Sequence, residues 1–490
     1  MAQAVAMMAV TDSHRKLFIA NEWVPSSDAK ETEVRDPSSN EVIAHAAAAT
    51  REDAKKAMDA AQAAFDGPWG ALSGGERGKL LWKWAAVLSE RRDAISEIET
   101  RNQGKTLREA RADIAFAIQT LEYYAGMADK IEGSTIPVPG ARINYTLREP
   151  MGATVHIAPW NYPFQLAMRS LAPALAAGNT AVLKPASLTP LSSLAMAEAA
   201  LLAGLPPGTF NVVTGGGSTV GDALLNHART AAVAFTGSVT TGLQVAAAAA
   251  NKVLPVTLEL GGKSPNIVFD DADLAAAVKG VMYGIFLNAG QMCWAGSRLL
   301  VHEPIAKAFL ENLKAEAEKL AMGPGLDKAT RMGPLVSRDH RSTVEHYIEA
   351  GKHEAKLLTG GHEPTDAKLS KGNYLAPTVF TDVPRNAKIA REEIFGPVLS
   401  VFSFKDEKEA VEIANDTEFG LFSGIWTRSL SRAHKVAAKI QAGMVAVNEY
   451  PVTFPQTPFG GYKMSGVGHE QGQDAVYQYT RLKNVTVYLG

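Results

Sequence analysis

Apolar and polar residues follow two alternating patterns along the first half of the chain. The segments 51–65 and 77–105 carry apolar residues at helical spacing with charged residues between them. Further helical stretches follow four short apolar runs that each end at proline or glycine, namely 153–159, 180–185, 210–215 and 231–237. Buried strands that alternate with helices are typical of an α/β fold with a doubly wound, mostly parallel sheet. We therefore predict such a domain up to about residue 258.

A second series of the same kind follows, with strands predicted at 266–270, 298–302 and 423–427. Two other segments, 143–150 and 484–490, are β-rich and have no crossover helix of their own. They indicate either an edge hairpin or an arm that pairs with another subunit, because an open strand edge is available to another chain.

Composition narrows the class of protein. The 490 residues are 46% hydrophobic and 20% charged, as expected for a soluble globular protein of two or three domains. The net charge of -2 and the lack of a basic run argue against nucleic acid or an anionic membrane as a partner. Residues 1–16 lack the basic start of a signal peptide, and no apolar run is long enough to span a bilayer. We expect a cytoplasmic protein that binds a small molecule.

The chain has a single cysteine, Cys293, within "LNAGQMCWAG". One thiol can form neither an internal disulfide nor a cysteine-rich zinc site. Taken alone, such a residue is more often a small buried hydrophobe than a reactive thiol. Four His-Glu pairs, which begin at 302, 353, 362 and 469, lack a second histidine four residues later, so we predict no catalytic metal.

The stretch "AFTGSVTTG" (234–242) places Gly237 and Ser238 where a helix should begin after a strand. Backbone N–H groups at a helix start suit a pyrophosphate. The signal is weak by itself, because such turns are common and the spacing is not G-x-G-x-x-G.

Two residues are candidates for acid–base and oxyanion chemistry. Glu259 ends an apolar strand and is either a solvated strand end or, if it is buried, a general base with a raised pKa. Asn161 lies between prolines in "PWNYP", and an amide held in a rigid turn is a good donor to a developing oxyanion.

Seven motifs occur in the order and spacing of the aldehyde dehydrogenase superfamily, which the chain resembles over nearly its whole length: "PWNYP", "LKPAS", "FTGS", "LELGGKSP", "GQMCWAGSR", "EEIFGPV" and "PFGGYKMSG". The resemblance implies that Cys293 adds to an aldehyde, that hydride passes to NAD or NADP, and that the resulting thioester is hydrolysed to the carboxylic acid. It also implies that Asn161 and the backbone N–H of Cys293 stabilise the oxyanion, and that Glu259 activates water. The glycine before the cysteine should let the backbone approach the substrate closely.

The resemblance further implies a set of cofactor contacts. Ser238 matches the pyrophosphate contact, Lys184 the adenosine-ribose contact, and Glu393 with Phe395 the nicotinamide-ribose clamp. Ser187 stands where the family often has a glutamate that excludes NADP, so we expect NADP to be accepted alone or beside NAD. The full predicted set is Trp160, Lys184, Ser187, Gly237, Ser238, Glu393 and Phe395.

The family fold implies three parts: a cofactor-binding domain at 1–127 and 150–258, a catalytic domain at 259–461, and an oligomerisation arm at 128–149 and 462–490. Such an arm predicts a homodimer or homotetramer.

Family analogy places a mixed set of side chains near the aldehyde, namely Tyr162, Leu166, Arg169, Leu287, Met292, Trp294, Thr453 and Phe459. Arg169 lies on the same face as Tyr162 and Leu166 of a helix expected to begin at Pro163. Either a nearby carboxylate or backbone carbonyl satisfies it, or it binds an oxygen at the far end of the substrate. Leu287 replaces a second arginine that is typical of succinate-semialdehyde enzymes, which favours hydroxylated or aromatic aldehydes.

Two alternatives stay open at this stage. The thiol and the carboxylate could act as a hydrolase or esterase without redox chemistry, or the chain could be a non-catalytic relative. Neither alternative would form reduced cofactor, whereas a dehydrogenase would, so this measurement distinguishes them.

Overall fold

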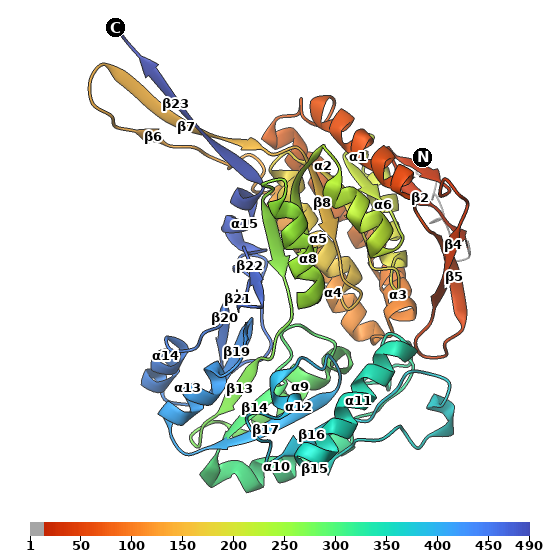
Figure 1. Ribbon diagram of the computed structural model, residues 1–490, viewed down its shortest axis with the longest axis vertical. Coiled ribbons are helices and arrows are strands. Elements are labelled where there is room, and N and C mark those ends of the chain that lie inside the picture. The colour runs from red at the N-terminus through yellow and green to blue at the C-terminus, as the bar shows by residue number, and fades with distance from the viewer. Residues whose placement is uncertain (1–13) are drawn as a thin grey trace.

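The computed structural model describes residues 14–490 (Figure 1). The first of its two large sheets has eight strands, seven of them from the first half of the chain and its immediate continuation to residue 259. The strand order is β22-β12-β11-β8-β9-β10-β2-β3. Five central strands are parallel: β12 (Val256–Glu259), β11 (Thr230–Thr236), β8 (Ala153–Ile157), β9 (Thr180–Lys184) and β10 (Phe210–Val212). The antiparallel edges are β22 (Gly466–Val467), β2 (Leu17–Ile19) and β3 (Glu22–Val24).

Helices cover both faces of this sheet, and each face has its own apolar core. One face carries α1 (Arg51–Asp66), α7 (Asp222–Asn226) and α8 (Val239–Ala250). The other carries α2 (Gly74–Glu90), α3 (Arg92–Gln103), α4 (Leu107–Ala125), α5 (Pro163–Ala176) and α6 (Leu191–Leu202). This arrangement confirms the predicted doubly wound domain.

The single helix predicted over 77–105 is wrong in one respect. The chain leaves helical geometry at Arg91 (φ -103°, ψ 5°), and α2 and α3 are separate helices. Neither glycine nor proline marks this break, so the spacing of apolar residues alone predicts one continuous helix.

The second half is a seven-stranded sheet of order β15-β16-β17-β14-β13-β19-β20, parallel except for β15. Its strands are β15 (Lys356–Thr359), β16 (Thr378–Thr381), β17 (Val398–Phe404), β14 (Arg298–His302), β13 (Pro265–Val268), β19 (Phe422–Trp426) and β20 (Met444–Val447). Its main helices are α9 (Leu274–Phe286), α10 (Glu303–Glu318), α11 (Arg338–Glu354), α12 (Lys388–Arg391), α13 (Glu407–Asn415) and α14 (Leu430–Ala437).

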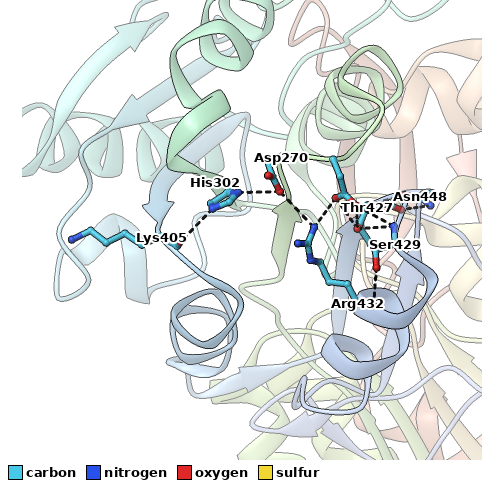
Figure 2. Close-up of polar contacts among 8 residues, drawn as sticks. Asp270, His302, Lys405, Thr427, Ser429, Arg432 and Asn448 are labelled. Atoms are coloured by element: carbon cyan, nitrogen blue, oxygen red, sulfur yellow. Dashed lines mark hydrogen bonds and ion pairs between the residues drawn. The ribbon is translucent and has the colours of Figure 1, made fainter.

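A polar network closes the carboxyl edge of this second sheet (Figure 2). Arg432 lies 2.8 Å from Asp271 and 3.5 Å from Asp270. His302 at the end of β14 is 3.2 Å from Asp270, and Thr427 after β19 donates to Asp271. These contacts join the ends of three strands to one another, which gives the network a structural role.

A three-stranded arm projects from the rest of the molecule (Figure 1). In it β23 (Thr480–Tyr488) pairs antiparallel with β7 (Arg142–Pro150), which also pairs with β6 (Thr135–Ile136). The arm is narrower than the predicted segment 462–490, because β22 extends the first sheet and α15 (Gly472–Gln478) packs beside α5. Smaller sheets join β1 (His14–Arg15), β5 (Val42–Ala47) and β4 (Glu31–Arg35), and β18 (Phe419–Gly420) with β21 (Tyr462–Lys463).

The expectation that residues 1–16 are not a signal peptide falls almost wholly outside the described residues. Within residues 14–490, no helix combines the length and apolar character that a membrane crossing requires.

Candidate active site

The predicted site residues gather where the carboxyl edge of the first sheet faces the amino edge of the second. Asn161 follows β8, Ser238 follows β11, and Glu259 is the last residue of β12. Cys293 lies just before β14 in the second sheet. Ligands bind at the carboxyl ends of strands in open α/β sheets, so this is the position expected for a site.

A cavity of about 210 Å³ joins these segments. Eight predicted residues line it: Trp160, Asn161, Leu166, Gly237, Ser238, Cys293, Glu393 and Phe395. Five lining residues were not predicted: Pro159, Thr236, Leu260, Gly261 and His340.

The turn before the cysteine has an unusual backbone. Asn288, Ala289 and Gly290 have φ values of 48°, 53° and 74°, the left-handed region that side chains rarely adopt. A Cβ on Gly290 would lie 2.1 Å from the carbonyl oxygen of Gly396. This glycine therefore lets the cysteine turn pack closely against the segment after Phe395, and its expected role in substrate approach stays a prediction.

Asn161 is tied to the same turn. Its Nδ2 donates to the carbonyl oxygen of Gln291 at 2.9 Å, and Asn288 Nδ2 donates to the carbonyl oxygen of Asn161 at 3.0 Å. The side chain is 3% exposed. One hydrogen bond thus holds the side-chain amide of Asn161 against the cysteine turn, and the other holds its backbone. The second Nδ2 hydrogen of the amide stays available as a donor.

Burial controls the protonation of the two candidate catalytic groups. It raises the pKa of the Cys293 thiol to about 12, although Arg169 acts in the opposite direction. Burial also raises the pKa of Glu259 well above its ordinary value, again opposed by Arg169. Both Glu259 oxygens lack a hydrogen-bond partner among residues 14–490. The thiol therefore keeps its proton at neutral pH, and burial favours the uncharged form of Glu259.

Glu393 and Phe395 border the opposite wall of the cavity. The Glu393 carboxylate accepts a hydrogen bond from Gly262 N–H at 2.8 Å, and a Cβ on Gly261 would lie 2.2 Å from it. Burial raises the pKa of Glu393 to about 7. Phe395 has a left-handed backbone (φ 58°), and its ring meets Trp160 edge-on with 5.2 Å between centroids.

The strand ends at β9 and β11 carry the remaining predicted cofactor residues. Ser238 caps α8 by accepting from Thr241 N–H at 3.3 Å. A Cβ on Gly237 would lie 2.6 Å from the Phe235 ring, so this glycine permits close packing of strand and turn. Lys184 Nζ donates to Pro185 O at 3.1 Å, and Ser187 Oγ donates to Gly215 O at 3.0 Å.

Arg169 on α5 forms a buried ion pair with Glu470, and both side chains are at most 2% exposed. The guanidinium carbon lies 4.1 Å from the centre of the Phe459 ring. Phe459 and Glu470 also exchange two backbone hydrogen bonds. Arg169 therefore has the carboxylate partner that one of the two readings of the sequence required, while its Nη2 lacks a partner among residues 14–490.

Of the other predicted substrate residues, Leu166 lines the cavity of about 210 Å³, and the rest lie in different surroundings. The Trp294 ring lies 5.5 Å from Phe459, and Thr453 Oγ1 donates to Gln471 at 2.9 Å. Lys105 Nζ lies 3.8 Å above the centre of the Tyr162 ring. Met292 is buried in the core, whereas Leu287 borders a separate cavity of about 490 Å³. Within residues 14–490, no group of three or more His, Cys, Asp or Glu side chains could hold a metal ion.

Sequence reasoning missed His340 and Glu470. His340 Nε2 lies 2.8 Å from the carbonyl oxygen of Phe395, and its ring packs 5.0 Å from Trp160. Glu470 belongs to one of the four His-Glu pairs. The sequence around it, "GVGHEQGQD", is mostly polar, so no local pattern indicates that this carboxylate is buried.

Comparison with known proteins agrees with this geometry. A betaine aldehyde dehydrogenase of Bacillus subtilis is 43% identical over 473 residues, 96% of each chain. A 4-trimethylaminobutyraldehyde dehydrogenase of Homo sapiens is 44% identical over 471 residues, 95% of each chain. The NAD⁺ complex of an aldehyde dehydrogenase from Bacillus cereus superposes with a TM-score of 0.97 at 40% identity, covering 100% of this chain and 99% of that one. Residues 23–485 match the model of the aldehyde dehydrogenase family, and the chain therefore belongs to that family.

Proposed function

We propose that Cys293 is the nucleophile, that Asn161 is the oxyanion donor, and that Glu259 is the base of an NAD(P)-dependent aldehyde oxidation. The observation that carries this assignment is the pair of hydrogen bonds that fixes Asn161 against the turn of the only cysteine. A donor held in place before the reaction stabilises a developing charge without further reorganisation.

The steps follow from these positions. Cys293 Sγ forms a bond to the aldehyde carbon, and the resulting oxyanion accepts hydrogen bonds from Asn161 Nδ2 and from the backbone N–H of Cys293. NAD or NADP, when bound, supplies the acceptor for the hydride that leaves this carbon. Glu259 then takes a proton from the water that attacks the thioester, and the carbon–sulfur bond breaks to release the carboxylic acid.

Proton loss is the first requirement of this scheme. Because burial raises the pKa of the Cys293 thiol to about 12, the thiol must lose its proton before Sγ can attack. Burial raises the pKa of Glu259 as well, so this carboxyl group must also give up its proton before it can act as a base on water. The Arg169 charge favours that loss, since it lowers the pKa of both groups against the effect of burial.

The residues around the cavity fit a dinucleotide. A side chain at Gly261 would clash with Glu393, so this glycine leaves room for the Glu393 carboxylate at the cavity wall. There the carboxylate can accept hydrogen bonds from a ribose diol. Ser238 at the start of α8 offers backbone N–H groups for a pyrophosphate. Lys184 and Ser187 would meet the adenosine ribose, and neither repels a 2′-phosphate. We therefore propose that NADP is accepted as well as NAD.

We propose that the arm mediates assembly into a homodimer or homotetramer. The cytoplasmic location expected from the sequence stays a separate proposal. Several of its large apolar side chains are exposed, namely Ile136, Ile143, Leu147, Leu482, Val487 and Tyr488. Exposed apolar residues on an open strand pair favour pairing with another copy.

We also propose that the substrate is a hydroxylated or aromatic aldehyde of small to medium size. The partnerless Nη2 of Arg169 is a buried donor close to the aromatic rings of Trp294 and Phe459. A hydroxyl or carbonyl oxygen at the far end of the substrate would satisfy it.

The test is a panel of aliphatic, aromatic, amino and acidic aldehydes assayed with NAD and NADP. We expect one reduced cofactor per carboxylic acid formed, and faster turnover of oxygenated aldehydes. Acid formation without reduced cofactor would favour the hydrolase alternative. If Cys293→Ala kept both the dehydrogenase and the esterase activity, Cys293 would not be the nucleophile.

A further inference from the structure

Two aromatic rings in the predicted aldehyde pocket already carry a cation from the protein itself. The Arg169 guanidinium carbon is 4.1 Å from the centre of the Phe459 ring, and Lys105 Nζ is 3.8 Å from the centre of the Tyr162 ring. Contact between a cation and the face of a ring is the interaction by which aromatic residues hold quaternary ammonium groups. In this protein those ring faces are occupied by fixed side chains.

Both internal cations are buried and fixed by carboxylates. Lys105 lies 2.5 Å from Asp113, and Arg169 is paired through Nε with Glu470. The four side chains are at most 11% exposed. Neither cation can turn toward solvent without leaving a buried carboxylate unpaired, so both remain in place when a substrate binds.

One side of the Arg169 guanidinium has no anion bound to it. Glu470 is engaged at Nε, whereas Nη2 has no partner among residues 14–490. Burial raises the pKa of Glu259, the other carboxyl group on which Arg169 acts, and so favours its uncharged form. A second cation placed beside Nη2 would therefore meet an arginine with little negative charge around it.

We infer that the Arg169–Glu470 pair, with the Arg169 guanidinium stacked on Phe459, makes this enzyme selective against aldehydes that carry a quaternary ammonium group. The inference deepens the proposed function. Relatives at 43% and 44% identity bear the names of betaine aldehyde and 4-trimethylaminobutyraldehyde dehydrogenases. The chain therefore shares their reaction, and its pocket directs that reaction to uncharged or oxygenated aldehydes.

A pair of isosteric substrates tests this on the wild-type protein. Betaine aldehyde and 3,3-dimethylbutanal have the same shape and differ by a quaternary nitrogen in place of a carbon. We expect kcat/KM for betaine aldehyde, corrected for its hydrated fraction, to be at least about 100-fold below that for the neutral isostere, since placing like charges together costs several kcal/mol. 4-Trimethylaminobutyraldehyde and 5,5-dimethylhexanal form a second isosteric pair with a longer carbon chain, and they allow the same comparison.

Variants then assign the selectivity to the pair. Arg169→Leu should raise the ratio of kcat/KM for betaine aldehyde to that for the isostere by at least about tenfold, because it removes the cation from the Phe459 face. Glu470→Gln should lower the ratio, because the cation loses its carboxylate. The matched control is Arg432→Leu, which removes an arginine from the polar network at the other edge of the second sheet (Figure 2). Arg432 also lies over an aromatic ring, 4.7 Å from the centre of Phe269, and its loss should leave the ratio unchanged.

Betaine aldehyde turnover within about threefold of the isostere in the wild-type enzyme would overturn the inference. An unchanged ratio in a folded Arg169→Leu protein, checked by thermal denaturation, would show that Arg169 is not the determinant. If that variant does not fold, the wild-type ratio and Glu470→Gln decide the question. Failure of the proposed function gives a different result, in which neither member of either pair yields reduced cofactor.

Discussion

Asn161 donates its side-chain amide to the backbone carbonyl of Gln291, two residues before Cys293, at 2.9 Å. Asn288, which opens the same turn in a left-handed conformation, returns a hydrogen bond to the Asn161 carbonyl at 3.0 Å. The turn after β8 and the turn before β14 are thus one unit, although 127 residues separate Asn161 from Asn288 in the sequence. These bonds therefore hold the proposed oxyanion donor, Asn161, at a fixed position relative to the turn that carries the proposed nucleophile, Cys293.

Asn161→Ala should lower kcat by about 10²–10³-fold, because it removes a preorganised donor to the oxyanion. Steady-state rates on the best aldehyde of the panel measure this, and alkylation of Cys293 by iodoacetamide reports whether the thiol stays accessible. A kcat within about tenfold of wild type would mean that backbone N–H groups stabilise the oxyanion without Asn161.

Cys293→Ala should abolish both dehydrogenase and esterase turnover, because the chain has no second thiol. Glu259→Gln should instead slow hydrolysis of the thioester. Rapid-mixing absorbance would then show an initial burst of reduced cofactor followed by slow turnover, and intact-protein mass spectrometry would detect the acyl-enzyme. Steady turnover at the wild-type rate in Glu259→Gln would assign the base to another group.

Which of these features the sequence could predict depends on how local each one is. The parallel strands that end at Lys184 and Glu259 were readable because each apolar run stops at a proline or glycine, or is followed by glycines. The partner of Arg169 could not be predicted, because Glu470 is 301 positions away in the sequence and meets Arg169 only in the folded chain. Similarly, the role of Gly290 depends on the carbonyl of Gly396, a neighbour that no local pattern indicates.

Cofactor binding should depend on pH through Glu393. Burial raises the pKa of its carboxyl to about 7, so the group is mostly neutral below that pH and ionised above it. An ionised carboxylate accepts hydrogen bonds from a ribose diol more strongly, so KM for NAD should fall as the pH rises from about 6 to 8. Glu393→Gln should raise KM and remove this dependence, and a KM that stays flat across the range in wild type would contradict the assignment.

The choice between NAD and NADP should depend on Ser187 and Lys184. Ser187→Glu should lower the ratio of kcat/KM for NADP to that for NAD by at least about tenfold, because a carboxylate repels the 2′-phosphate. Burial lowers the pKa of Lys184 to about 8, and its Nζ hydrogen-bonds to Pro185 O, so the ammonium is present below that pH and is lost above it. The same ratio in the wild-type enzyme should therefore fall as the pH rises through about 8, since only NADP needs the positive charge.

Lys184→Met is the matched control for this titration. It should lower kcat/KM for NADP more than kcat/KM for NAD. It should also make the ratio of the two independent of pH, because the group that titrates is gone. Ser187→Ala, which keeps the position uncharged, should leave the ratio within about threefold of wild type. Two results together would contradict this assignment: kcat/KM for NADP several orders of magnitude below that for NAD in the wild-type enzyme, and a ratio that Ser187→Glu does not change. Residues away from the end of β9 would then select the cofactor.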